Sequence, residues 1–168
     1  MRKRFHQILA ALPALGVLTL ALVGTAAASS GRNFRAHLAG RNEVPPVNTN
    51  AQGQAIYNLS KDGTSLAFKL VVASIADVTQ AHIHCGAAGV NGPVVAFLYG
   101  FGPTVSPDGI LSEGVLTNAN VIPRPNSAEC PGGVASFDDL MDKIRSGDAY
   151  TNVHTLQNPG GEVRGQIH

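Results

Sequence analysis

Short runs in which apolar and polar residues alternate recur along this chain, and Gly, Pro, Asn or Asp residues separate them. Alternation with a period of two is typical of half-buried β-strands. The pattern predicts strands over residues 33–38, 54–60, 66–72, 80–85, 94–99, 110–116, 150–155 and 162–167. Short strands with turn signals between them predict an all-β fold, here a Greek-key-like antiparallel β-sandwich.

Two connections predict hairpins. Asp62-Gly63 joins the second and third runs, and Asp-Gly between alternating runs is a strong short-range hairpin signal. Residues 158–161, Asn-Pro-Gly-Gly, join the last two runs in the same way. By contrast, Pro45 and Pro46 lack N–H donors, so the segment around them is expected to be an edge or a loop.

One segment, residues 136–146, shows helical rather than strand periodicity. Ser136 can cap its first turn, Asp139 stands three residues on as in a capping box, and Gly147 can end the helix. The apolar face consists of Leu140, Met141 and Ile144. We expect this single short helix to cover an open end of the sandwich.

The strand over residues 80–85 carries the candidate chemistry. Side chains alternate along a strand, so His82 and His84 share one face, while Ala81, Ile83 and Cys85 share the other. A two-residue step is about 6.5 Å, which lets two imidazoles lean toward one cation. One face of this strand is therefore interpreted as a site and the other as anchorage in the core.

A third imidazole, His154 in Asn-Val-His-Thr, lies on another predicted strand. With His82 and His84 it would form a three-nitrogen metal site with an open position, which suits Cu(II) or Zn(II) in ligand type and number. The alternative is that the histidines are structural and bond backbone carbonyls. The remaining histidines considered, His37 and His168, are expected at the surface.

Glu162 and Arg164 share one face of the last strand and are candidates for the surroundings of this site. A carboxylate can orient an imidazole, and a guanidinium near an open metal position can hold an anion. The interpretation that we favour is simpler, a cross-strand Glu–Arg pair within the hairpin.

The first residues predict export. Arg2-Lys3-Arg4, an apolar stretch and Ala26-Ala27-Ala28 form a signal peptide over residues 1–28, which leaves one domain over residues 29–168. Removing residues 1–28 with their three basic side chains changes the formal charge from +1 to −2. We therefore expect no nucleic-acid partner, no membrane attachment after cleavage, and a periplasmic or extracellular location.

Cys85 and Cys130 are the two cysteines of the chain. In an oxidising compartment they are expected to form a disulfide, which would tie the strand of His82 and His84 to the Gly/Pro-rich segment before the helix. The oxidising location also favours copper over metals bound through thiolates, and it does not exclude zinc.

Four separated motifs occur in a fixed order: FRAHLAGRNEVPPV at 34–47, AHIHCG at 81–86 with NGPVV at 91–95, YTNVHT at 150–155, and PGGEVRGQ at 159–166. In this order they resemble the CHRD domain, the module named after chordin. The resemblance spans about residues 34–167 and implies one secreted β-sandwich module, without implying a defined activity.

A weaker resemblance is to the copper–zinc superoxide dismutases, sandwiches with an H-x-H strand and a distant third histidine on copper. No histidine stands between His84 and His154, so the bridging ligand of those enzymes has no counterpart. We therefore expect metal binding through His82, His84 and His154 with weak or absent dismutase turnover. The alternatives are a dismutase-like copper enzyme and a metal-free adhesion module with a protein partner.

Overall fold

The computed structural model describes residues 31–100 and 102–168. The strands are β1 (Asn33–Ala39), β2 (Gln52–Leu59), β3 (Leu66–Ala73), β4 (Val78–Cys85), β5 (Val94–Tyr99), β6 (Gly109–Leu116), β7 (Ala149–Thr155) and β8 (Val163–Gln166). The helical elements are the 3-10 turns η1 (Gly40–Asn42) and η2 (Asn118–Asn120) and the α-helix α1 (Phe137–Ser146). The predicted signal peptide, residues 1–28, lies outside the described residues.

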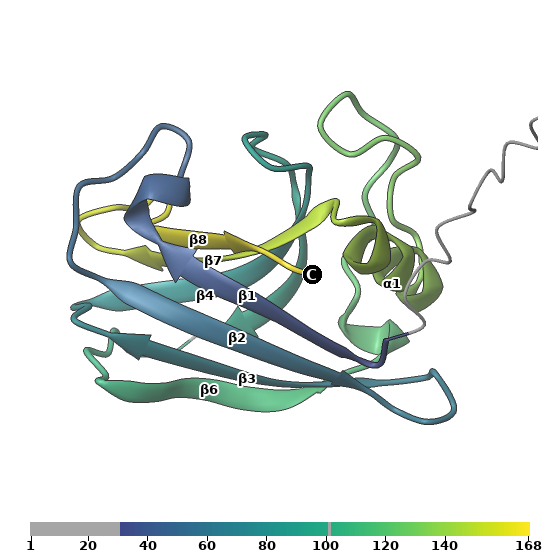
Figure 1. Cartoon of the computed structure of the whole chain (residues 1–168), viewed down its shortest axis with the longest axis horizontal. Coiled ribbons are helices and arrows are strands. Elements are labelled where there is room, and N and C mark those ends of the chain that lie inside the picture. The colour runs from purple at the N-terminus through teal and green to yellow at the C-terminus, as the bar shows by residue number, and fades with distance from the viewer. Residues whose placement is uncertain (1–30, 101) are drawn as a thin grey trace, which may run out of the picture.

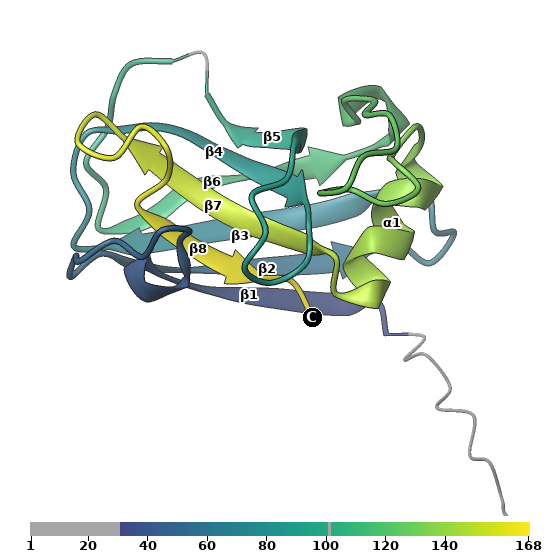
Figure 2. The same ribbon diagram turned by 90° about the horizontal axis from the view of Figure 1, so that it is seen from above.

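All described strands belong to one antiparallel sheet with the order β5-β4-β7-β8-β1-β2-β3-β6. The sheet folds over on itself, so that the half containing β4 and β7 packs across the half containing β2 and β3 (Figures 1 and 2). The two edge strands, β5 and β6, approach each other and nearly close the structure. The chain crosses between the halves after β3, β5 and β6, and the predicted all-β sandwich is confirmed.

The predicted hairpins form because alternation and turn chemistry agree. In β2 every second residue is buried, and the turn at Asp62-Gly63 pairs Leu59 with Leu66. Gly63 has φ +75°, a left-handed conformation that glycine adopts readily. β7 and β8 pair antiparallel across the second predicted turn. The largest fully buried aliphatic side chains are Leu38, Leu66, Leu70, Ile83, Leu140, Met141, Ile144 and Ile167.

Helix α1 has the predicted caps and covers one end of the sandwich (Figure 2). The Ser136 hydroxyl accepts a hydrogen bond from the Asp139 N–H, and the Asp139 carboxylate accepts one from the Ser136 N–H. Gly147 ends the helix with φ +78°. The buried face consists of Phe137, Leu140, Met141 and Ile144, so the helix contributes to the same core as the sheet.

Strands β4 and β7 are buried on both faces, unlike β1 and β2. One face contributes Ala81, Ile83 and Val153 to the core. The outer face carries polar side chains, and loops cover it. The loop over 86–93 accepts a hydrogen bond from the guanidinium of Arg164 on β8. The segment over 40–51 donates one from Thr49 to Glu162, the residue before β8. This covered polar layer is where the histidines lie.

The disulfide between Cys85 and Cys130 is present, as predicted, and both residues are fully buried. It closes a loop with a sequence separation of 45 between the end of β4 and the segment before α1. Constraint of the unfolded chain by a loop of this length is worth about 4 kcal/mol. We therefore expect the Cys85→Ala/Cys130→Ala variant to lose up to about 4 kcal/mol of unfolding free energy in urea titrations. Equal stability of this variant and the oxidised protein would contradict the prediction.

Candidate metal site

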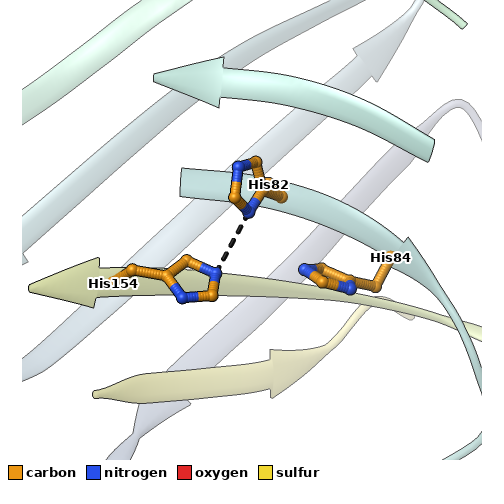
Figure 3. A group of neighbouring side chains, drawn as sticks. All are labelled: His82, His84 and His154. Atoms are coloured by element: carbon orange, nitrogen blue, oxygen red, sulfur yellow. Dashed lines mark hydrogen bonds between the residues drawn. The ribbon is translucent and has the colours of Figure 1, made fainter. Parts of the chain in front are cut away.

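His82 and His84 on β4 and His154 on β7 converge on one point of the covered face (Figure 3). β4 and β7 pair antiparallel with Gln80 opposite His154, which places all three imidazoles on the same side of the sheet. One ligand nitrogen from each residue lies within 4.8 Å of the others. The side chains are 4 %, 8 % and 9 % exposed, so the group is almost removed from water.

Backbone carbonyls fix the proton positions of two of these rings. His84 Nδ1 lies 2.8 Å from the carbonyl oxygen of Gly92, and His154 Nδ1 lies 2.9 Å from that of Pro159. A carbonyl only accepts, so each Nδ1 carries the proton and each Nε2 of the neutral ring carries a lone pair. The Nε2 of His84 is buried and has no hydrogen-bond partner, which is costly for a polar atom.

The third ring can hold its proton at either nitrogen. His82 Nδ1 lies 3.0 Å from His154 Nε2, and His82 Nε2 lies 3.1 Å from Gln80 Oε1. Because His154 Nε2 has no proton, it accepts the N–H of His82 when Nδ1 is protonated. The Asn152 amide, 3.0 Å from the same nitrogen, must then face it with its NH2 group as a donor. When the proton is on Nε2 instead, Gln80 accepts it, and Nδ1 of His82 presents a third lone pair beside those of His84 and His154.

Burial keeps these rings neutral. Desolvation, followed by the charges of the neighbouring histidines, lowers the pKa of His82 from 6.5 to about 3. Desolvation is also the main cause that lowers the pKa of His84 to about 4, against the hydrogen bond to Gly92. The pKa of His154 is lowered by burial as well. At neutral pH protons therefore do not compete for the three lone pairs.

Aromatic rings form the walls of the group. Phe97 of β5 packs edge-on against His82 at a centroid distance of 4.5 Å. Tyr150 of β7 stacks on His84 at 4.7 Å with an interplanar angle of 10°. The guanidinium carbon of Arg164 lies 3.3 Å from the centroid of the Tyr150 ring. Tyr150, Asn152 and His154 are spaced two residues apart on β7 and therefore share a face. From this spacing the sequence could have predicted that Tyr150 lies at the site.

The expected pair between Glu162 and Arg164 does not form. The Glu162 carboxylate accepts hydrogen bonds of 2.7 Å from the hydroxyls of Thr49 and Thr155. The Arg164 guanidinium donates to the Asn91 side chain and to carbonyls of the loop over 86–93. The prediction of this pair was wrong because other segments, mainly the loops that close over the outer face, supply hydrogen-bond partners to both side chains.

Neither candidate bonds an imidazole directly. The hydrogen bonds of the three rings go to Gly92, Pro159, Gln80 and Asn152 and between His82 and His154. Arg164 still acts on His84, since its charge contributes to lowering the pKa of that ring. Glu162 instead holds the connection before β8 in place through Thr49 and Thr155.

Glu43 is a buried acid near the site that the sequence reasoning did not identify as functional. It follows η1, its side chain is 5 % exposed, and its Oε1 has no hydrogen-bond partner. Burial raises its pKa to about 7, although the positive charge of Arg164 opposes this shift. Periodicity gave no signal for it because it lies in a loop that reaches the site only through folding. His37 and His168 are exposed, as predicted.

Among the described residues no helix is long and apolar enough to cross a membrane. A family model described as "CHRD domain" matches residues 34–167. Chordin from Xenopus laevis is 28 % identical over 132 residues, which cover 78 % of this chain and 12 % of that protein. The chain thus spans a small part of this relative's length. Comparison with solved structures finds no match.

Proposed function

The chain belongs to the CHRD domain family, and we propose that this member is an exported module that binds one copper or zinc ion through His82, His84 and His154. The observation that carries the proposal is the direction of the lone pairs. Two backbone carbonyls hold the protons of His84 and His154 on Nδ1, so that both Nε2 lone pairs lie within the cluster, that of His84 without a partner and that of His154 beside His82 and Asn152. Outer hydrogen bonds of this kind orient histidine ligands in metal sites.

The distances fit this assignment with a small adjustment. Copper and zinc bind imidazole nitrogen at about 2.0–2.1 Å, so nitrogens around one trigonal or tetrahedral ion lie about 3.3–3.6 Å from each other. The present limit of 4.8 Å therefore requires the rings to close by about 1.2–1.5 Å. His82 would keep its proton on Nε2 and donate it in a hydrogen bond to Gln80 Oε1, which leaves Nδ1 to bind the ion.

The metal-free alternative explains the same residues less well. A purely structural role would leave the buried Nε2 of His84 without a partner. It would also bury three imidazoles almost completely. The only hydrogen bond between these three rings joins His82 to His154. A bound ion would satisfy all three nitrogens at once.

Metal analysis of protein purified without a nickel column tests the proposal. After incubation with copper or zinc and removal of excess ion, we expect about one equivalent in native mass spectrometry. His154→Ala should retain less than a tenth of this amount, because two imidazoles alone form a much weaker site. His37→Ala removes an exposed histidine from β1 and should bind like the wild type. No bound ion in the wild type, or equal binding in His154→Ala, would refute the proposal.

A further inference from the structure

A buried cation lies behind the wall of the candidate metal site. Arg164 is 2 % exposed, and its three hydrogen bonds go to neutral acceptors, Asn91 Oδ1 and the carbonyls of Ala87 and Val90. Among the described residues the ion pairs are Lys69–Glu113 and Arg145–Asp142, both of which are largely exposed. The positive charge of Arg164 is therefore buried without a carboxylate in contact.

Tyr150 connects this charge to the site. Its ring contacts the guanidinium carbon of Arg164 at 3.3 Å and stacks on His84 at 4.7 Å. The space between the cation and the candidate ligand is thus filled by an aromatic ring rather than by water. In such a medium an electrostatic interaction is screened far less than at the protein surface.

From this geometry we propose that the site selects Cu(I) over divalent ions, and that Arg164 sets the preference. The inference rests on the proposed function. The repulsion between a fixed positive charge and a bound ion grows in proportion to the charge of the ion, so it is twice as large for Zn(II) or Cu(II) as for Cu(I). The three neutral imidazoles bring no negative charge to offset it.

The coordination sphere favours the same ion. Zn(II) takes four ligands in proteins, which for a three-histidine site means an added water or anion. The three imidazoles are at most 9 % exposed and lie between Phe97 and Tyr150, which leaves little room for water. Cu(I) is a d¹⁰ ion of low charge and is satisfied by three nitrogen donors. Charge and coordination number thus act in the same direction.

Substitution of Glu43 should change metal selectivity in the opposite direction to substitution of Arg164. It is the carboxylate whose charge interacts with both Arg164 and Tyr150, so in its ionised form it partly offsets the guanidinium. Removing the negative charge should strengthen the repulsion of divalent ions, and removing the positive charge should weaken it. A change in local folding alone would not produce opposite effects in these two variants.

The measured quantity is the ratio of the Cu(I) affinity to the Zn(II) affinity at pH 8. Cu(I) affinity is obtained anaerobically by competition with bathocuproine disulfonate, and Zn(II) affinity by competition with a chromophoric chelator. We expect Arg164→Gln to lower the ratio at least tenfold, chiefly through tighter Zn(II) binding. Glu43→Gln should raise it about threefold or more. Arg145→Gln, which removes an exposed arginine of α1, should leave it within twofold.

The outcomes separate this inference from the proposed function. If the wild type binds neither ion, the proposed function fails and the inference fails with it. If the wild type binds metal but Arg164→Gln and Glu43→Gln leave the ratio unchanged, the selectivity inference is overturned and the metal site stands. Weaker binding of both ions by the same factor in Arg164→Gln would also overturn it. Should Arg164→Gln fail to fold, the rise in Glu43→Gln decides the question.

Discussion

Between pH 6.5 and about 4.5 the metal-free protein should lose unfolding free energy by roughly 2–3 kcal/mol for each unit of acidification. The cause is the neutral state of the three buried imidazoles. Burial lowers the pKa of His82 to about 3 and that of His84 to about 4, from 6.5, and lowers that of His154 as well. Over this range the unfolded chain binds protons that the folded chain does not bind.

The sign follows from proton binding. A histidine whose folded pKa is lowered contributes stability that is complete above 6.5 and declines as the pH falls toward the folded pKa. Each such group contributes a slope of about 1.4 kcal/mol per pH unit, before a reduction for residual solvent screening. Glu43 acts in the opposite sense, because its pKa is raised to about 7 and its burial favours the protonated form as the pH falls. The three histidines outweigh this single carboxyl group.

Urea titrations of the metal-free protein at several pH values between 4.5 and 8 measure this slope. His84→Gln should reduce it by about one proton, or about 1.4 kcal/mol per pH unit. His37→Gln alters an exposed histidine and serves as the matched control. A stability that is flat from pH 6.5 to 4.5 would show that the folded protein binds as many protons as the unfolded chain over this range, which would contradict the predicted neutral cluster.

The second large effect is expected from Gly92→Ala. A Cβ at this position would lie 1.6 Å from the carbonyl oxygen of Cys85, which is backbone and cannot move away easily. Gly92 also accepts the hydrogen bond of His84 Nδ1 and donates its N–H to the Tyr150 hydroxyl. We therefore expect a loss of more than about 3 kcal/mol of unfolding free energy. Metal affinity should fall by about tenfold or more, because the carbonyl that orients His84 is displaced.

Gly160→Ala is the matched control for this variant. Nothing lies within 4 Å of a Cβ built at Gly160, and its φ is not in the left-handed region. Its unfolding free energy should stay within about 0.5 kcal/mol of the wild type. Denaturant midpoints and zinc affinities of both variants decide the matter. Equal midpoints for Gly92→Ala and Gly160→Ala would mean that the loop over 86–93 can move away from Cys85 at little cost.

Local patterns in the sequence were sufficient for the elements and for the faces of the site strand. The alternation around His82 and His84 separates them from Ile83 and Cys85 whatever the strand pairs with, because side-chain direction depends only on the local backbone. The hairpin at Asp62-Gly63 and the helix after Ser136 are likewise determined by neighbouring residues. For this reason these predictions agree with the structure to within a few residues.

The surroundings of the histidines depend on contacts between distant segments, which no local period encodes. Arg164 bonds a loop more than 70 residues earlier, and Glu43 reaches the same layer from η1. Glu162 turns away from Arg164 because Thr49 and Thr155 offer hydroxyls at 2.7 Å. These partners are chosen when the loops close over β4, β7 and β8 and exclude water. Once water is excluded, a buried charge or nitrogen without a partner raises the free energy of the folded state. This cost, which the local sequence does not encode, determines which side chains pair.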